Sequence, residues 1–187
     1  MPVERLDDQA LLAGYADGVA EVAVAFVRRF QGYVYGVALA IVGDPNLAED
    51  IAQLAFERAW KSAGRYDVTK AGVKTWLTAI TRNLAIDSLR VRRPVPVDPV
   101  DLIRLLGSAE DEPQERAIGA DRAATLRSAI RALPREQGRA LVMAGMYRMT
   151  AEEVSIAEGI PLGTAKTRIR AGLRKLRDDV TVRESEQ

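Results

Sequence analysis

Apolar residues recur along most of the chain at the spacing of helices that bury one face. Between residues 19 and 42 they fall close to every 3.6 positions, with a possible break at Gln31 and Gly32. Asp44 and Pro45 are typical of a helix start, because aspartate caps free backbone amides and proline suits the first helical position. A second helix is therefore predicted over residues 45–61.

The second predicted helix has an apolar stripe, and both of its large aromatic residues are expected in the core. Phe56 and Trp60 are placed there because large aromatic side chains are mostly buried. A loop with two glycines is predicted over residues 62–71. A long helix then runs from about Val73 to Arg92, and Pro94 ends it.

The second half of the chain is also predicted to be helical, at residues 115–132 and 136–147. Strand signals are almost absent, because the one β-branched stretch, residues 91–100, contains three prolines. We therefore predict an all-α fold of two small helical domains joined by a flexible acidic linker. The expected boundaries are 1–93 for the first domain, 94–113 for the linker and 114–187 for the second domain.

The second domain ends in a predicted helix-turn-helix. Thr150 caps a short helix, and Glu153 three residues later completes a capping box. Gly159 ends that helix because the tight turn requires a positive φ, and Pro161 opens the final helix. Glu158 stands just before the turn, where an apolar residue usually packs. This departure leaves the register of the short helix open.

Charge is balanced in total but segregated along the chain. Lys and Arg number 27 against 26 Asp and Glu, which gives a formal net charge of +1. Acidic residues dominate segments 44–57 and 98–121, whereas basic residues dominate segments 70–93 and 160–177. The two basic segments predict two patches able to meet a polyanion, although each segment alone could be an ordinary solvated helix face.

The chain contains neither cysteine nor histidine, which excludes several kinds of site. Disulfides, zinc sites of Cys or His type, cysteine nucleophiles and Ser-His-Asp triads are impossible. No catalytic residue, metal ligand or cofactor is predicted. The acidic start is unlike a signal peptide, and the longest uncharged run, residues 30–43, is too short for a membrane span. A cytoplasmic protein without membrane insertion is expected.

Sequence stretches from both halves carry a resemblance to a known family. They are GDPNLAEDIAQLAFERAW at 43–60, TWLTAITRNLAIDSLR at 75–90, LPREQ at 133–137 and GTAKTR at 163–168. These stretches resemble parts of bacterial RNA polymerase sigma factors of the extracytoplasmic-function (ECF) group. The first is similar to the core-binding helix, the second to the promoter-melting helix, and the last two to the second DNA-binding domain. The resemblance implies a promoter-specificity subunit that binds core RNA polymerase and promoter DNA and is held inactive by an anti-sigma factor.

The resemblance also assigns the first two sets of site residues. Core polymerase is expected to meet an acidic and amide face made of Glu49, Asp50, Gln53 and Glu57. Opening a duplex requires cations for phosphates and aromatic rings for unstacked bases. The expected minus-ten contacts are Tyr66, Lys70, Lys74, Trp76, Arg82, Asn83 and Arg90.

The final helix supplies the third set, because a recognition helix enters the major groove by its N-terminal end. The expected minus-thirty-five contacts are Thr164, Lys166, Thr167, Arg168, Arg170 and Arg174. The chain departs from the family pattern at Leu54, where an acid is usual, and at Ala171, where a base is common. The departure at Leu54 weakens the charge contact expected with the polymerase or moves it onto Asp50 and Glu57. The departure at Ala171 narrows the base-contacting set of the final helix.

Other classes of function remain open on the sequence. An autonomous helix-turn-helix regulator would normally bind paired half-sites as a dimer, and no dimerisation helix is evident. A decoy that kept a sigma-like fold would fit the departures at Leu54 and Ala171. An enzyme is disfavoured, because adjacent Glu152 and Glu153 point to different helix faces and no nucleotide-binding glycine motif is present.

Overall fold

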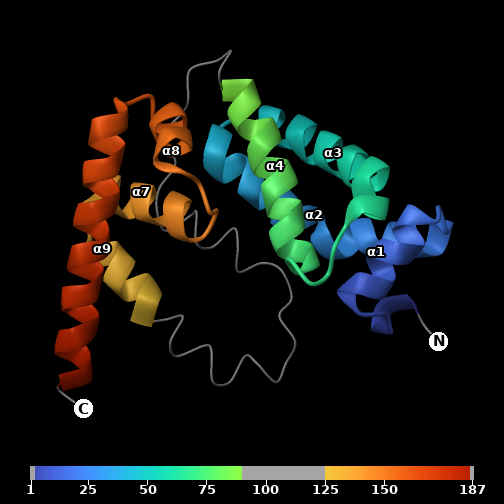
Figure 1. Ribbon diagram of the computed structural model, residues 1–187, viewed down its shortest axis with the longest axis horizontal. Coiled ribbons are helices and arrows are strands. Elements are labelled where there is room, and N and C mark those ends of the chain that lie inside the picture. Colours follow the sequence, from blue (N-terminus) through green and yellow to red (C-terminus); the bar gives the residue numbers. More distant parts are fainter. Residues whose placement is uncertain (1–2, 90–124, 186–187) are drawn as a thin grey trace.

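The computed structural model describes residues 3–89 and 125–185, apart from some side chains near the ends, and these residues are mainly helical (Figure 1). The first range contains η1 (Val3–Arg5), α1 (Asp8–Ala16), α2 (Ala20–Val42), α3 (Pro45–Ser62), η2 (Ala63–Arg65) and α4 (Val73–Leu89). The second contains helical residues 125–132, then α7 (Arg135–Gly145), α8 (Ala151–Glu158) and α9 (Leu162–Ser185). No strand occurs in these ranges, which confirms the predicted all-α class.

The described ends of the predicted helices lie within about two or three residues of the prediction, whereas α1 was not predicted. The predicted acidic linker, the start of the helix expected at residue 115, and Arg90 to Arg92 lie outside the described residues. The possible break at Gln31 and Gly32 does not occur, because the 23-residue helix α2 runs through both residues. Phe30 and Val34, on either side of this glycine, are fully buried and hold the helix against its neighbours.

The corner between α2 and α3 forms as its residues predict. Gly43 adopts φ of 72°, a left-handed conformation that suits glycine, and its amide donates to the Leu39 carbonyl at 2.8 Å. The Asp44 carboxylate then accepts from the amides of Asn46 and Leu47 at 2.9 and 3.2 Å. These two caps end one helix and begin the next within two residues, so α2 and α3 pack side by side.

One apolar core lies among α1, α2, α3 and α4. Phe26 is at its centre, with ring centroids 4.5 Å from Tyr15, 4.9 Å from Phe30 and 6.2 Å from Phe56. Phe56 is partly buried there, but the prediction for Trp60 is wrong, because its side chain is 54% exposed. The buried residues of α3 end with Ala55 and Ala59, and Trp60 lies about 140° around the helix from Ala55.

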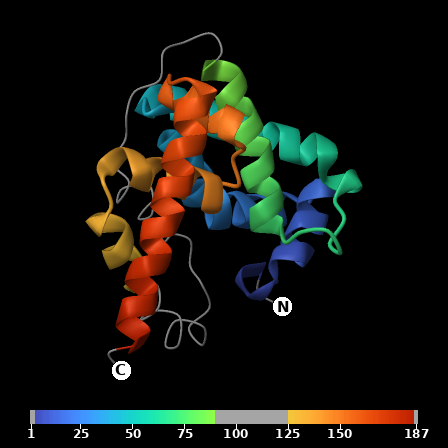
Figure 2. The ribbon, with the colours of Figure 1, turned by 60° about the vertical axis from the view of Figure 1, so that its left-hand side comes forward.

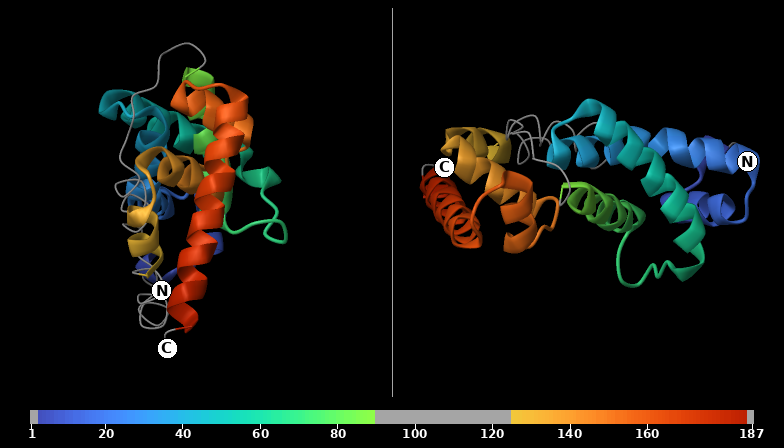
Figure 3. Two further views of the ribbon diagram at one scale, coloured as in Figure 1. Left: turned by 90° about the vertical axis from the view of Figure 1, so that its left-hand side faces the viewer. Right: turned by 90° about the horizontal axis from the view of Figure 1, so that it is seen from above.

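A second apolar core joins the two halves of the chain. Val37 and Ile41 of α2 and Ile86 of α4 belong to the same buried cluster as Tyr147 and Met149, which lie between α7 and α8. Helix α4 contacts α8, and the two helices lie side by side in Figures 1 and 3. The halves therefore share buried surface instead of standing apart.

The helix-turn-helix forms with the predicted local chemistry. The Thr150 hydroxyl accepts from the Glu153 amide at 3.2 Å, and the Glu153 carboxylate accepts from the Thr150 amide at 2.7 Å. Gly159 ends α8 with φ of 62°. Helix α9 then packs against both α7 and α8, and Figure 2 shows it running past them. The expected capping box and turn glycine are both confirmed.

Substituting alanine for Gly172 is expected to destabilise the second half by about 1–3 kcal/mol through overpacking. A Cβ there would lie 3.0 Å from the Gln137 carbonyl oxygen and 3.3 Å from the Leu141 Cβ, because α9 approaches α7 closely at this point. Gly163→Ala on the same helix is the control, since a Cβ there meets open space. Thermal unfolding should show a lower Tm for G172A alone; equal Tm values would contradict the close approach.

Candidate functional site

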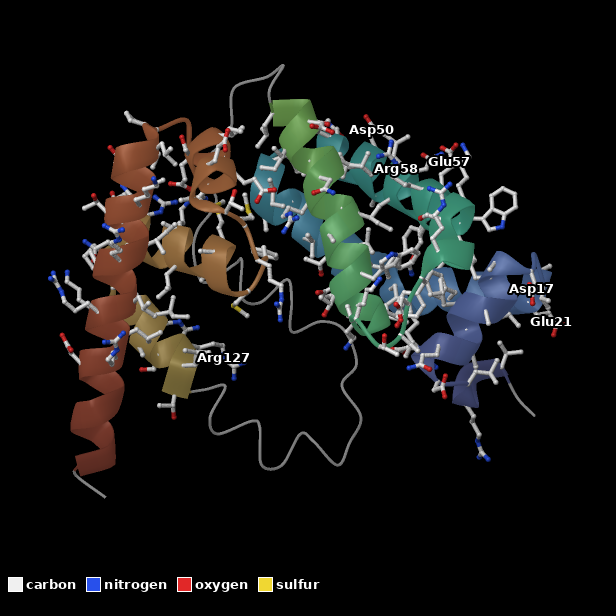
Figure 4. All side chains as sticks on the ribbon, in the orientation of Figure 1. Asp17, Glu21, Asp50, Glu57, Arg58 and Arg127 are labelled. Carbon is white, nitrogen blue, oxygen red and sulfur yellow. The ribbon has the colours of Figure 1, made fainter. Side chains whose placement is uncertain are left out.

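The acidic face expected on α3 is formed and exposed. Glu49, Asp50, Gln53 and Glu57 are all exposed, and Figure 4 shows Asp50 and Glu57 pointing outward from α3. Their spacing of three and four residues places Asp50, Gln53 and Glu57 along one side of the helix. Leu54, 48% exposed, adds an apolar side chain to this outer face. We call these five residues the α3 face.

Bases also lie close to the α3 face. Lys61 donates to the Glu57 carboxylate one turn away, and this hydrogen bond lowers the pKa of Glu57. A groove beside this pair is lined by side chains of both charges and by two leucines, namely Leu54, Glu57, Arg58, Lys61, Ser62, Arg65 and Leu84. The C-terminal end of the α3 face is therefore of mixed charge, whereas Glu49 and Asp50 give its N-terminal end an acidic character.

The loop before α4 is held by an aromatic pair and by local hydrogen bonds. The Tyr66 ring lies edge-on to Trp76 with centroids 5.3 Å apart, and its hydroxyl donates to the Ala71 carbonyl at 2.8 Å. Both rings are partly buried, and desolvation raises the pKa of Tyr66. Asp67 accepts from the hydroxyl and amide of Thr69, which lowers the pKa of Asp67. The aromatic pair is thus part of the core as well as of the loop surface.

The other residues predicted to contact the minus-ten element differ in their exposure and in their partners. Lys70 is exposed and pairs with Asp67 at 3.3 Å, while Lys74 is half-buried at the start of α4. Asn83 is exposed, and its side-chain oxygen accepts from Arg82 at 3.3 Å. Arg90 lies outside the described residues. The structure therefore brings Tyr66, Lys70, Lys74 and Trp76 together around the loop and the start of α4.

Arg82 faces the helix-turn-helix instead of open solvent. Its Nη1 donates to the Arg148 carbonyl at 2.7 Å, and its Nε lies 3.3 Å from the Glu153 carboxylate. Arg148 has φ of 53°, a left-handed conformation uncommon for a residue with a side chain. Glu153 thus caps α8 and pairs with α4 at once. Sequence reasoning found the cap but missed this contact, because its partners are 71 residues apart.

The final helix presents most of its predicted DNA contacts outward. Lys166, Thr167, Arg170 and Arg174 are exposed, and Thr164 is half-buried. The Thr167 hydroxyl donates to the Gly163 carbonyl at 2.9 Å, one turn earlier. Basic and hydroxyl side chains on one outer surface can contact both phosphates and base edges. The exception is Arg168, which is only 28% exposed.

Glu158, the polar residue at an expected apolar position, forms a buried ion cluster. Its carboxylate lies 2.5 Å from the Arg139 Nε and 3.5 Å from the Arg168 Nη1, through different oxygens. The side chains of Glu158 and Arg139 are only 8% and 4% exposed. This cluster links α7, α8 and α9. The unusual glutamate was the sequence signal for it, but its partners were not predicted.

Two kinds of feature are absent from the residues that the structure describes. They contain no group of three or more acidic side chains placed to hold a metal ion. None of their helices is both long and apolar enough to cross a membrane.

Comparisons with known proteins match both halves of the chain. Residues 26–94 match Sigma-70 region 2, and residues 123–176 match Sigma-70, region 4. The chain is 32% identical over 182 residues to "ECF RNA polymerase sigma factor RpoE" of Cereibacter sphaeroides, covering 95% of this chain and 97% of that protein. The chain belongs to the ECF sigma factors of RNA polymerase. The resemblance drawn from the sequence is therefore confirmed.

Other ECF sigma factors and solved structures are also similar to this chain. SigW of Bacillus subtilis is 26% identical over 156 residues, covering 79% of this sigma factor and 83% of SigW. A solved structure of CnrH in complex with the cytosolic domain of CnrY aligns with a TM-score of 0.46 and 19% identity, covering 94% of this chain and 97% of that chain. As an ECF sigma factor, this chain is a transcription initiation factor, and the autonomous-regulator alternative is not favoured.

Proposed function

We propose that this sigma factor binds core RNA polymerase through the α3 face and promoter DNA through two separate cationic surfaces. The observation that carries the proposal is that these three surfaces exist on different elements, one on α3, one around the loop and α4, and one on α9. It works by binding in the cytoplasm and has no catalysis of its own. The proposed division is 1–93 for polymerase and minus-ten binding, 94–113 as linker and 114–187 for minus-thirty-five binding.

The minus-ten surface combines the aromatic pair with cations. Tyr66 and Trp76 offer ring faces and edges for unstacked bases, and Lys70 and Lys74 offer charge for the backbone phosphates. Asn83 is an exposed amide able to contact DNA. Arg82 joins this surface once α4 and α8 separate, because a phosphate and Glu153 would compete for the same guanidinium group. Arg90 completes the proposed set.

The minus-thirty-five surface is the outer side of α9. We assign base and phosphate contacts to Thr164, Lys166, Thr167 and Arg170, and a backbone contact to Arg174, which lies one turn further from the helix start. As the family resemblance implies, an anti-sigma factor is the expected inhibitor. With no cysteine or histidine in the chain, thiol or zinc sensing would have to reside in that partner.

The test is transcription from a library of upstream sequences on linear templates, with purified core polymerase and with or without this protein. Discrete start sites that depend on the protein would support the proposal, and the enriched upstream elements would define its promoter. A stable complex with core polymerase but no start sites would favour a decoy. Duplex binding without any polymerase complex would instead favour an autonomous regulator.

Charge reversal at Asp50 tests the polymerase contact directly. Asp50→Lys should weaken binding to core polymerase at least about tenfold, because it places a cation where the proposal requires an acid at the interface. Glu21→Lys is the matched control, since Glu21 is an exposed acid at the start of α2, away from Asp50 in Figure 4. Affinity is measured by titration of labelled protein with core enzyme. Equal weakening by both substitutions would contradict the assignment.

A further inference from the structure

Helix α9 has an inward face and an outward face, and Arg168 lies on the inward one. Ala165 and Gly172 are buried, and Ile169 packs against the shared core. Arg168 follows Ala165 by three residues and precedes Gly172 by four, which places it on the same side of the helix. The exposed cations on the other side include Lys166, Arg170 and Arg174.

Glu158 is the acid that pairs with Arg168. One carboxylate oxygen contacts Arg139 of α7 at 2.5 Å, and the other faces the Arg168 Nη1 at 3.5 Å. Because Glu158 and Arg139 are nearly fully buried, their positions are fixed by the packing of α7 and α8. Arg168 is partly exposed, so its guanidinium lies at the edge of the buried cluster, between Glu158 and solvent.

We propose that Glu158 is a positioning residue that withholds Arg168 from promoter DNA and thereby sets which side chains of α9 read the minus-thirty-five element. This inference rests on the proposed DNA contacts of α9. An arginine released from Glu158 beside the major groove of the DNA would add an attraction to phosphates that is the same for every sequence. It could also pair with guanine edges. Pairing with Glu158 removes both effects, so discrimination is left to Thr164, Lys166, Thr167 and Arg170.

The test measures how salt weakens binding of the holoenzyme to its selected promoter duplex. Glu158→Gln keeps the shape of the side chain but removes the charge that holds Arg168. The slope of log K against log salt should become steeper by about 0.9, the value for one additional phosphate contact on duplex DNA. Preference for the selected minus-thirty-five element over a scrambled one should fall several-fold. Glu152→Gln, an exposed acid on the same helix, controls for the lost negative charge.

Arg168 itself supplies the decisive comparison. Arg168→Gln alone should leave the salt slope unchanged, and the double variant E158Q/R168Q should return to the wild-type slope. The inference is overturned if R168Q alone reduces the slope by about 0.9, or if E158Q matches E152Q. Circular dichroism checks that each variant is folded. If E158Q is unfolded, the salt slope of R168Q alone tests the inference, because an unchanged slope supports it and a reduced slope contradicts it.

A further variant separates this inference from the function beneath it. Arg170→Ala should reduce both affinity and the salt slope, because Arg170 is among the exposed cations assigned to DNA. If R170A has no effect, the proposed minus-thirty-five surface is wrong. If R170A acts as expected and E158Q does not, only the role of Glu158 is wrong.

Discussion

Replacing Arg139 with leucine is expected to lower the free energy of unfolding by about 3–5 kcal/mol, the usual result of removing one partner from a buried ion pair. The substitution would leave the Glu158 carboxylate buried, with Arg168 as its remaining partner in the cluster, at 3.5 Å. The Tm should fall by roughly 10 °C for a chain of this size. Transcription at elevated temperature should fail accordingly.

The companion variant R139L/E158L distinguishes an unpaired charge from lost packing. Apolar residues in place of a buried ion pair are often neutral or stabilising, so the double variant should recover at least half of the lost stability. Arg131→Leu, at an exposed arginine in helical residues 125–132, should change stability by less than about 0.5 kcal/mol. A double variant no more stable than R139L would show that the charge pairing is not what stabilises this cluster.

Alkaline pH should destabilise the wild-type protein more steeply than a Tyr147→Phe variant. Burial in the shared core strongly raises the pKa of the Tyr147 hydroxyl, because the charged phenolate would lose its solvation. The unfolded chain releases this proton near pH 10, while the folded protein retains it. The contribution of Tyr147 to the free energy of unfolding is therefore fully present below about pH 10 and decreases as the pH rises further.

The expected size is about 1.4 kcal/mol for each pH unit above 10. Urea unfolding at several pH values between about 8 and 12 measures it, with the two curves diverging above the ordinary tyrosine pKa. Burial also raises the pKa of Tyr15, so the variant should retain part of the alkaline loss. Parallel curves for the two proteins would show that Tyr147 has the same pKa in the folded and the unfolded chain, which would contradict the raised pKa.

Local chemistry explains what the sequence predicted well. Asp44 and Thr150 supply their helix caps from side chains two or three residues away, and Gly159 adopts the left-handed turn conformation that its position required. Such features depend on neighbours in the chain, so a single sequence contains them. The exposure of the acidic residues on α3 and of the bases on the outer side of α9 agrees with what the resemblance and the helix-turn-helix pattern implied, while their contacts with polymerase and DNA stay predictions.

Features that depend on distant residues were not predicted. Trp60 was misplaced because apolar spacing alone does not show where the buried stripe of a helix ends. The packing of α2 and α4 against α3 decides which residues of α3 are buried. Arg82 was assigned to DNA, and its contact with Glu153 requires knowledge of how the two halves meet. Arg168 resembled the other bases of α9 until Glu158 was located in space.

The shared core also has a consequence for any partner that requires α4 and α8 to be apart. Such a partner must uncover Tyr147 and Met149, both almost completely buried. At about 25 cal/mol per Å², each 100 Å² of apolar surface exposed to water costs roughly 2.5 kcal/mol. The partner's apparent affinity equals its intrinsic affinity multiplied by the fraction of molecules that are already open, so a small open fraction weakens binding. A substitution that weakens this core would therefore increase the open fraction and tighten binding of the partner, even at a residue that the partner does not contact.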